Sequence, residues 1–464
     1  MFSYAQVVLA QHQSDAEYVP PPLPEFESLF DAEFEGSPAP DFGRATLSSL
    51  FVNKDKAKVV FLAHGSYGRT LRTSTTAAEK WRGEVDENPV TFFYHTLYPH
   101  LVRSIRMAAP LIGASPANTV LVTNVEEGIA AVLNSVCTPV TSSNNAYRLI
   151  AFDFTYGACR YALERVAQRQ GCFLDIIPTT SPITTDSIIR DARAYFEKNL
   201  VNVEKGPIKL FLFEHITSPS ALVLPIHELV AMCKKHNIMS LIDGAHGIGQ
   251  IYLELEKLQP DFYTTNAHKW LCHTRGTALL YIHPSHHATI KPLITSWGAP
   301  NGNVQAEFIW QGTNDYSSHL TLPITIKTLK WLSKGDVPSI YTRNRLLARR
   351  AAVFLSSVWN TDTLSPDLDM FASMVSVRVP VRRQAAVDCG EEACGISDLH
   401  DDLLKNHGIE VPVFTFRGAK YVRVSIHVYN EWNDVKVLGR SVLVELGYPV
   451  DEAVFKQYST PKHE

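Results

Sequence analysis

The sequence has no excess of charge of either sign and no long uncharged apolar run. Lys and Arg number 43 against 47 Asp and Glu, which leaves a formal net charge of −4. Nucleic acids and anionic membranes bind to concentrated basic surfaces, so we expect neither as a partner. No window approaches the run of about 18 apolar residues that a membrane span requires. The 45% hydrophobic content is that of an ordinary globular chain with a large buried core.

Cysteines are few and show no pairing pattern. There are seven, an odd number, scattered along 464 positions. No Cys/His cluster has the spacing of a zinc site, because the nearest approach, Cys389 and Cys394, lacks a second pair. The N-terminus lacks the basic stretch and the cleavage site of a secretory leader. We therefore expect no metal, reduced thiols and a cytoplasmic location.

Three regions follow from the distribution of Pro, acidic and apolar residues. Residues 1–45 are rich in Pro, Ser and acid, and we interpret them as an N-terminal extension, either an arm packed on a partner or a disordered tail. Over residues 46–325, short apolar runs alternate with amphipathic helical stretches, which predicts a large α/β domain with a mostly parallel, doubly wound sheet. Residues 326–464 have the order strand, helix, strand, strand, helix, which predicts a smaller α+β domain. The strands expected in the large domain are VVFLAHG, TVLVTN, RLIAFDF, FLDIIPT, IKLFLFEH, MSLIDGAH, DFYTTNAH and TALLYIH.

Two of these strands end in residues that suggest one chemistry. LIDGAHG places Asp243 after a strand, and TTNAHKW places Lys269 at the end of another strand, 26 residues later. Doubly wound sheets bind ligands at this carboxyl edge. Pyridoxal phosphate needs such a pair: a lysine that forms a Schiff base with its aldehyde, and a carboxylate that keeps its ring nitrogen protonated. By itself the pair is a weak signal, and the residues around it carry the argument further.

Several blocks occur in one order along the chain: FLAHGSYG, TNVEEGIAAVLNSV, FDFTYGAC, HITSPSALVLPI, LIDGAHGIGQI, PDFYTTNAHKWL, QGTNDYSSHLTLP and YVRVS. Together they resemble the class V aminotransferase-fold enzymes, in particular the isopenicillin-N-epimerase-like branch, from about Val59 to Leu446. The resemblance implies a fold-type I enzyme dependent on pyridoxal 5′-phosphate. It also implies an amino-acid-derived substrate and a homodimer with shared active sites.

The same resemblance assigns the residues around the cofactor ring. Lys269 matches the Schiff-base lysine, and Asp243 matches the partner of the ring nitrogen. His246, three residues after Asp243, matches a side chain that hydrogen-bonds the 3′-oxygen. Tyr156, in FDFTYGAC, resembles the aromatic residue that stacks on the ring, with a packed turn as the alternative. Ser218, in HITSPSALVLPI, is also placed on the cofactor.

A second group of residues is expected around the phosphate. Val125 and Glu126 open a helix after a strand, so their backbone N–H groups can face an anion. Glu126 departs from the family pattern, which commonly has a Thr at this position. A carboxylate beside a phosphate is unfavourable, so Glu126 must point away, be neutralised or serve the substrate. The resemblance adds two neighbours of the lysine and one residue from the other subunit: Asn266, His268 and Thr313.

Arg423, in YVRVS, matches the arginine that binds the substrate carboxylate, and its planar fork suits that group. The alternative is a strand-surface arginine in an ion pair. His64 and Ser66, in FLAHGSYG, resemble the loop on the substrate side, with a Gly-flanked turn as the alternative. Cys394 lies 29 residues before Arg423, a position that resembles the reactive thiol of cysteine desulfurases, but adjacent acids disfavour its thiolate.

These residues predict chemistry at the α-carbon of an amino acid without fixing its outcome. We expect an epimerase or lyase, and the resemblance implies a role in specialised metabolism. Three alternatives stay open: a cyclase that forms carbon–carbon bonds, a cysteine desulfurase or C–S lyase that uses Cys394, and a non-catalytic homologue. The same side chains around the cofactor serve all of the enzymes, so the motifs do not choose among them.

Overall fold

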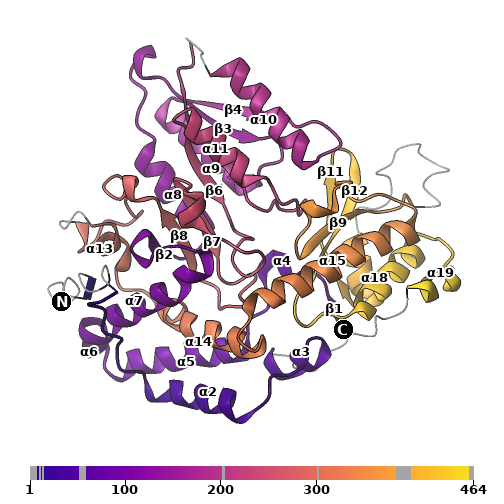
Figure 1. Ribbon diagram of the computed structural model, residues 1–464, viewed down its shortest axis with the longest axis horizontal. Coiled ribbons are helices and arrows are strands. Elements are labelled where there is room, and N and C mark those ends of the chain that lie inside the picture. The colour runs from indigo at the N-terminus through magenta and orange to yellow at the C-terminus, as the bar shows by residue number, and fades with distance from the viewer. Residues whose placement is uncertain are drawn as a thin grey trace.

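A computed structural model describes residues 8, 9, 12, 15–51, 59–200, 204–299, 303–382 and 399–458. Cys389 and Cys394 lie outside the described residues, so the prediction about Cys394 is not addressed by the structure. Among the described helices, none is long and apolar enough to cross a membrane. Figure 1 shows a large sheet with helices around it and a smaller group of C-terminal elements to one side.

The large sheet has seven strands in the order β2-β8-β7-β6-β5-β3-β4. Only β8 runs antiparallel to its neighbours, so the sheet is mostly parallel, as predicted. The strands are β2 (Thr119–Val122), β3 (Arg148–Phe152), β4 (Phe173–Ile177), β5 (Ile208–Glu214), β6 (Met239–Asp243), β7 (Phe262–Asn266) and β8 (Ala278–Ile282).

Both faces of this sheet are buried. Along β5, Phe211 and Phe213 enter one hydrophobic core, while Leu210 and Leu212 enter the other. Successive side chains of a strand point to opposite faces, so a strand covered on both sides must be apolar throughout, as IKLFLF is. Helices α8 (Val125–Val136) and α9 (Gly157–Gln170) share the second core, whereas α10 (Thr185–Asn199) and α11 (Ile226–Lys235) share the first.

The C-terminal elements form a separate antiparallel sheet, in the order β11-β12-β9. Its strands are β9 (Met374–Arg378), β11 (Val413–Phe416) and β12 (Ala419–Ser425). Helices α15 (Val337–Trp359), α17 (Leu399–His407) and α18 (Trp432–Glu445) accompany them. The predicted order of strand, helix, strand, strand, helix is therefore present, with the two-residue strand β10 (Ile409–Glu410) added after α17.

One predicted strand belongs elsewhere. The segment VVFLAHG was expected in the large sheet, but its only strand, β1 (Val60–Phe61), pairs in parallel with β10. Val60 N–H donates to the Gly408 carbonyl at 2.8 Å, and Ser425 N–H donates to the Leu62 carbonyl at 2.8 Å. The C-terminal elements thus supply the hydrogen-bonding partners for this short segment. It ends in the single-turn helix α4 (His64–Tyr67).

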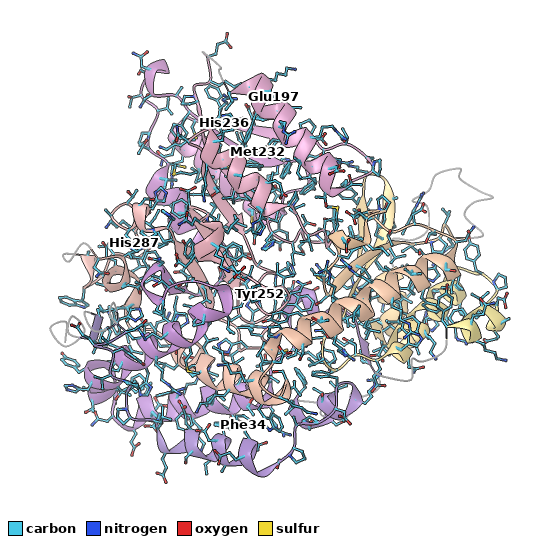
Figure 2. The ribbon with its side chains drawn as sticks, in the orientation of Figure 1. Phe34, Glu197, Met232, His236, Tyr252 and His287 are labelled. Carbon is cyan, nitrogen blue, oxygen red and sulfur yellow. The ribbon has the colours of Figure 1, made fainter. Side chains whose placement is uncertain are left out.

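The described part of the N-terminal extension packs on its own chain. Helix α2 (Glu25–Gly36) lies against α5 (Arg72–Glu87) and α14 (Ser317–Leu332). Phe26 meets the Trp81 ring edge-on, with ring centroids 5.3 Å apart. Phe34, at the outer edge of the molecule in Figure 2, packs on Trp331. The remaining described helices include α3 (Arg44–Leu50), α6 (Pro89–Thr91), α7 (Leu97–Ala108), α12 (Leu255–Leu258), α13 (Val304–Ile309) and α19 (Glu452–Gln457).

A buried ion pair fixes α2 in place. Arg103 of α7 donates two hydrogen bonds to the Glu27 carboxylate, at 2.7 and 2.8 Å, and both side chains are buried. Lys327 of α14 lies 3.8 Å from the same carboxylate. Removing one partner of such a pair leaves an uncompensated buried charge, which costs more than an exposed pair contributes.

We expect Glu27→Gln to lower the free energy of unfolding by about 3 kcal/mol, because Arg103 would keep its charge without a carboxylate. Urea unfolding followed by circular dichroism measures this loss. Glu25→Gln, an exposed change in the first turn of the same helix, is the control and should cost about 0.5 kcal/mol or less. Equal effects of the two variants would contradict the structural role of the pair.

Candidate active site

A crevice opens at the carboxyl edge of the large sheet. Glu214, Asp243 and Asn266 are the last residues of the adjacent strands β5, β6 and β7, and all three line it. Lys269 follows Asn266 by three residues and also faces this crevice. The parallel register places Glu214 directly beside Asp243. The strand-end acid and lysine of the sequence therefore meet in one place, where doubly wound sheets bind ligands.

Lys269 is held in a form that suits a nucleophile. Its Nζ lies 3.3 Å from His246 Nε2. Burial lowers the pKa of Lys269 to about 8, while the charge of Asp243 acts in the opposite direction and Arg423 adds to the lowering. With a pKa of about 8, roughly a tenth of the amines are neutral at pH 7, against about one in 3,000 for an ordinary lysine. A neutral amine is the species that attacks an aldehyde.

His246 has a fixed tautomer. Trp270 Nε1–H donates to His246 Nδ1 at 3.2 Å, so the single proton of the neutral ring is on Nε2. Burial, followed by the charge of Lys269, lowers the pKa of His246 well below its usual value, which keeps the ring neutral. His246 therefore presents an N–H donor beside Lys269, as hydrogen bonding to an oxygen of the cofactor requires. No sequence pattern indicates this role of Trp270.

Asp243 is held by two donors. Its Oδ1 accepts the Ala245 N–H at 2.8 Å, and its Oδ2 accepts the Cys159 S–H at 3.1 Å. Burial raises the pKa of Asp243, an effect that these hydrogen bonds and the nearby Lys269 oppose. A cationic ring nitrogen would add the partner that a buried carboxylate lacks.

Glu214 is a second buried carboxyl group that the sequence analysis missed. Its Oε1 accepts the Tyr156 N–H, while Oε2 has no hydrogen-bond partner among the described residues. Burial and the adjacent Asp243 raise the pKa of Glu214 to about 8. The sequence pattern that indicated Asp243, an acidic residue at the end of an apolar strand, also applies to Glu214. The Tyr156 side chain lines the crevice at the start of α9, where the stacking residue was expected.

The phosphate side is built around the start of α8. Asn124 caps this helix by accepting the Glu127 N–H, and Val125 N–H donates to Asn266 Oδ1 at 3.2 Å. Since Asn266 uses its amide oxygen here, its NH₂ group remains available as a donor. The Glu126 side chain is exposed and lines the crevice rather than pointing away from it. His268 also lines the crevice, and its buried Nδ1 has no partner in the described part of the chain.

Arg423 on β12 reaches the crevice from the C-terminal sheet. Its Nη1 donates to Ser218 Oγ at 2.9 Å, and its Nη2 donates to Ser66 Oγ at 2.7 Å. The side chain is buried, it makes no ion pair with a described acidic residue, and its Nε has no hydrogen-bond partner there. Burial lowers the pKa of Arg423 to about 10, so it remains a cation at neutral pH. A buried cation without an acidic partner is suited to an anionic ligand such as a carboxylate. The alternative, an arginine on the strand surface in an ion pair, does not match this buried side chain.

One expected site residue, His64, is placed differently. It is fully buried and does not line the crevice, because its ring nitrogens face the Lys269 carbonyl and the Tyr429 hydroxyl. Ser218 lines the crevice and accepts a hydrogen bond from Arg423, while its expected contact with the cofactor stays a prediction. Thr313 is exposed and lies outside the crevice of its own chain, so its expected service to the other subunit stays a prediction.

Comparison with known proteins gives the class. Residues 100–438 match Aminotransferase class-V, and the chain belongs to this family. Its cofactor is pyridoxal 5′-phosphate, and the predicted fold class is confirmed.

Individual relatives include enzymes of more than one reaction type. The chain is 26% identical over 426 residues to putative L-cysteine desulfhydrase 2 of Oryza sativa subsp. japonica, with 86% of each chain covered. It is 26% identical over 396 residues to isopenicillin N epimerase of Streptomyces clavuligerus, covering 81% of this chain and 92% of that relative. Among solved structures, a C-DES mutant with glycine covalently linked to its PLP cofactor matches with a TM-score of 0.68 at 17% identity. That match covers 83% of this chain and 96% of the other.

The residues of the crevice fit this cofactor. Glu214 and His268 line the crevice and carry buried polar atoms that have no partner in the described chain, as expected where a polar cofactor would bind. Gly128 allows the close approach of α8 to the sheet, because a Cβ there would lie 2.5 Å from Thr264 Oγ1. Helix α8, whose first residues Val125 and Glu126 line the crevice, therefore sits directly on the strand that leads to Lys269. The Val125 N–H is already bonded to Asn266, so the expectation that it faces the phosphate is not supported by the structure.

We expect the rate of cofactor loading to follow the ionisation of Lys269. Loading of the apoprotein with pyridoxal phosphate, measured by the growth of visible absorbance, should rise with pH and level off above about pH 8. The rate rises with pH because only the neutral amine of Lys269 reacts with the aldehyde. Burial lowers the pKa of this amine, so the neutral form is populated at a lower pH than for an ordinary lysine. Nα-acetyl-lysine is the reference amine. A loading rate that still rises at pH 10, as for this reference, would contradict the lowered pKa.

Proposed function

We propose that this protein removes a proton from the α-carbon of an amino acid and then expels a sulfur leaving group, as a C–S lyase. The observation that carries the α-carbon chemistry is the meeting of Lys269 and Asp243 in one crevice, with the Arg423 guanidinium bound to two serines, Ser66 and Ser218, that line it. The lyase outcome is supported by the desulfhydrase-like relatives. Pyridoxal phosphate, when bound, supplies an electron sink for the α-carbon.

Each side chain has a task that follows from its surroundings. Lys269 would hold the cofactor and then act as the base, because burial keeps its pKa close to the working pH. Asp243 would pair with the ring nitrogen, and His246 would donate its Nε2–H to a ring oxygen. Arg423 would bind the substrate carboxylate and so orient the α-hydrogen toward Lys269. The side chains of Ser66 and Ser218 keep the guanidinium in position.

An epimerase remains the second candidate, because isopenicillin N epimerase is among the relatives at similar identity. It would use the same residues as far as the loss of the α-proton. The branch point depends on whether the β-carbon carries a leaving group. A role in specialised metabolism and the formation of carbon–carbon bonds stay predictions.

We also propose a homodimer with shared active sites. Tyr67 in α4 lines the crevice, and its side chain is 74% exposed, while Trp297 is 67% exposed. Exposed aromatic residues of this kind are typical of surfaces that a partner covers. By contrast, Trp310 and Tyr316 stack on one another inside the chain, with ring centroids 5.6 Å apart. These two residues belong to the intramolecular core rather than to a substrate pocket.

With L-cysteine in deuterated water, we expect the holoenzyme to release equal amounts of sulfide, pyruvate and ammonia, and Lys269→Ala to release none. The three products are measured separately in one reaction. Cys394→Ala should keep this activity, because elimination needs no second thiol. Recovery of deuterated cysteine without sulfide would overturn the lyase proposal in favour of the epimerase. Loss of sulfur release in Cys394→Ala would point to desulfurase chemistry.

Arg423→Lys should raise the L-cysteine concentration for half-maximal change in cofactor absorbance about tenfold or more. A lysine has one charged nitrogen in place of the fork that binds both carboxylate oxygens. Arg440→Lys, at an exposed arginine of α18 that pairs with Glu452, is the matched control and should leave this value unchanged. If Arg423→Lys leaves the half-maximal L-cysteine concentration unchanged, the proposed role of Arg423 in substrate binding is wrong.

A further inference from the structure

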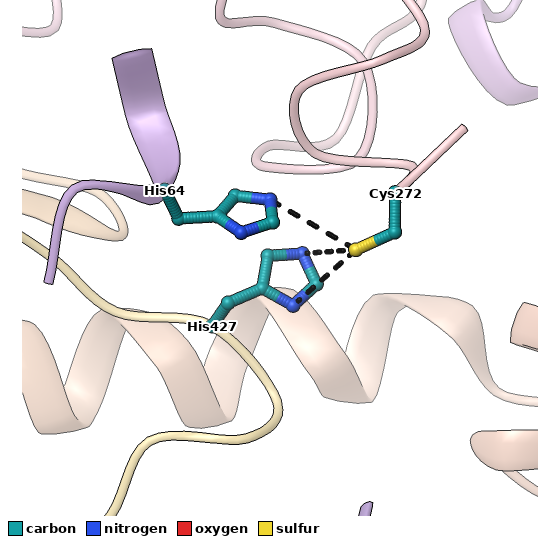
Figure 3. A group of neighbouring side chains, drawn as sticks. All are labelled: His64, Cys272 and His427. Carbon is teal, nitrogen blue, oxygen red and sulfur yellow. Dashed lines mark hydrogen bonds between the residues drawn. The ribbon is translucent and has the colours of Figure 1, made fainter. Parts of the chain in front are cut away.

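Behind Lys269, on the side away from the crevice, two histidines and a cysteine converge. Figure 3 shows His64, Cys272 and His427 pointing toward one another from three separate segments. All three are buried, and one ligand atom from each lies within 4.8 Å of the others. These are zinc-ligand types at a separation that a tetrahedral site could use. The hydrogen bonds around them decide whether a metal can bind.

The nitrogen atoms of His427 are already committed. Its Nδ1 accepts the Val428 N–H at 2.8 Å, so the proton of the neutral ring is on Nε2. That Nε2–H faces the Trp270 carbonyl at 3.2 Å and Cys272 Sγ at 3.5 Å. Burial lowers the pKa of His427 to about 4, which keeps the ring neutral. His427 therefore has no lone pair to offer a metal at this position.

His64 is committed in the same way. Its Nε2 lies 2.8 Å from the Lys269 carbonyl oxygen, which can only accept, so Nε2 carries the proton. Its Nδ1 then accepts the Tyr429 O–H at 2.7 Å. Burial also raises the pKa of the Cys272 thiol, which disfavours the thiolate that a metal requires. Both imidazoles thus direct N–H groups at the sulfur and at two carbonyl groups.

We propose that His64 and His427 form an imidazole clamp that positions Lys269 by holding the carbonyl groups of Lys269 and Trp270. The two rings lie against one another, with centroids 4.1 Å apart and planes tilted by 34°, and the His427 ring stacks on Trp270 at an interplanar angle of 16°. Trp270 in turn fixes the tautomer of His246, which faces Lys269 Nζ. The clamp therefore acts on Lys269 through its backbone and through His246.

The turn after Lys269 needs such support. Cys272 has a φ of 54°, a left-handed conformation that a residue with a Cβ adopts at a cost. Its N–H donates to the Lys269 carbonyl at 3.1 Å, the same oxygen that His64 binds. Two donors on one carbonyl hold the turn closed behind Lys269. The sulfur of Cys272 lies beside both rings, 3.5 Å from His427 Nε2 and 3.9 Å from His64 Nε2, as a weak acceptor.

The clamp also connects the substrate side to the lysine. His427 and Tyr429 follow β12 directly, and Arg423 lies on that strand only four residues before His427. A shift of β12 as a carboxylate binds Arg423 would be transmitted to the Lys269 carbonyl through these residues. This positioning role rests on the proposed function, in which Lys269 holds the cofactor.

The experiment uses full-length protein and two readouts, bound zinc and the pH of half-maximal cofactor loading. His64→Leu removes the clamp, and His64→Gln keeps a side-chain N–H near the same carbonyl. We expect less than about 0.1 zinc per chain in the native protein. We expect His64→Leu to raise the loading midpoint by about one pH unit, because Lys269 becomes more exposed to solvent, and His64→Gln to restore most of it.

A double-mutant cycle separates positioning from general destabilisation. Tyr429→Phe removes the donor to His64 and should raise the loading midpoint in the native background but not in His64→Leu. Cys272→Ala should leave the midpoint in place, although a metal site would lose its thiolate. Urea unfolding of each variant records the loss of stability independently of the pH midpoint.

Three outcomes would overturn the clamp: one zinc per chain that is lost in Cys272→Ala, a midpoint unmoved in His64→Leu, or equal effects of the Leu and Gln changes. Lys269→Ala keeps the two proposals apart. Visible absorbance of a covalently bound cofactor that persists in Lys269→Ala would overturn the proposed function itself. If that absorbance is lost while His64→Leu matches the native protein, only the clamp fails.

Discussion

A lysine amine buried at the end of a strand is the constraint on which this structure depends. An ammonium group out of water is unfavourable, so the protein must either pair Lys269 or lower its pKa. It does both in part. Burial lowers the pKa to about 8, and Asp243 limits the fall. Around Lys269 lie a neutral donor, His246, and the buried carboxylate Asp243, while the Arg423 cation adds to the lowering of its pKa.

The sheet brings these residues together. Parallel strands with apolar side chains on both faces leave only their ends for polar residues, so Glu214, Asp243 and Asn266 gather along one edge. Arg423 approaches from a second sheet, so the residue proposed to bind the substrate carboxylate and the residues proposed to hold the cofactor belong to different parts of the chain. The link between these parts is made by Ser66 and Ser218, which line the crevice and bind the guanidinium.

Much of this could be predicted from the sequence, because it depends on short-range patterns. Apolar runs predicted most strands of the large sheet, and the polar residues at two strand ends pointed to Lys269 and Asp243. The roles of these two residues and of His246 came from the resemblance to the family. Glu214 followed the same rule and could have been found by it. Trp270, His427 and Tyr429 could not, because their roles depend on contacts between segments more than 150 residues apart, such as His427 with Trp270. The partner of β1 was also out of reach, since two residues show no periodicity that would choose between sheets.

The pairing of β1 with β10 has a consequence for how the chain is assembled. The C-terminal sheet region is completed by a strand from near the start of the sequence, and Gly43 adds a hydrogen bond to the Val428 carbonyl at 2.7 Å. The smaller body is therefore discontinuous in sequence, with the whole large domain inserted between its parts. Its contacts have high sequence separation, and such contacts form late in folding because a long loop must close first. An excised C-terminal fragment would leave the β10 edge unpaired and open to association with other chains.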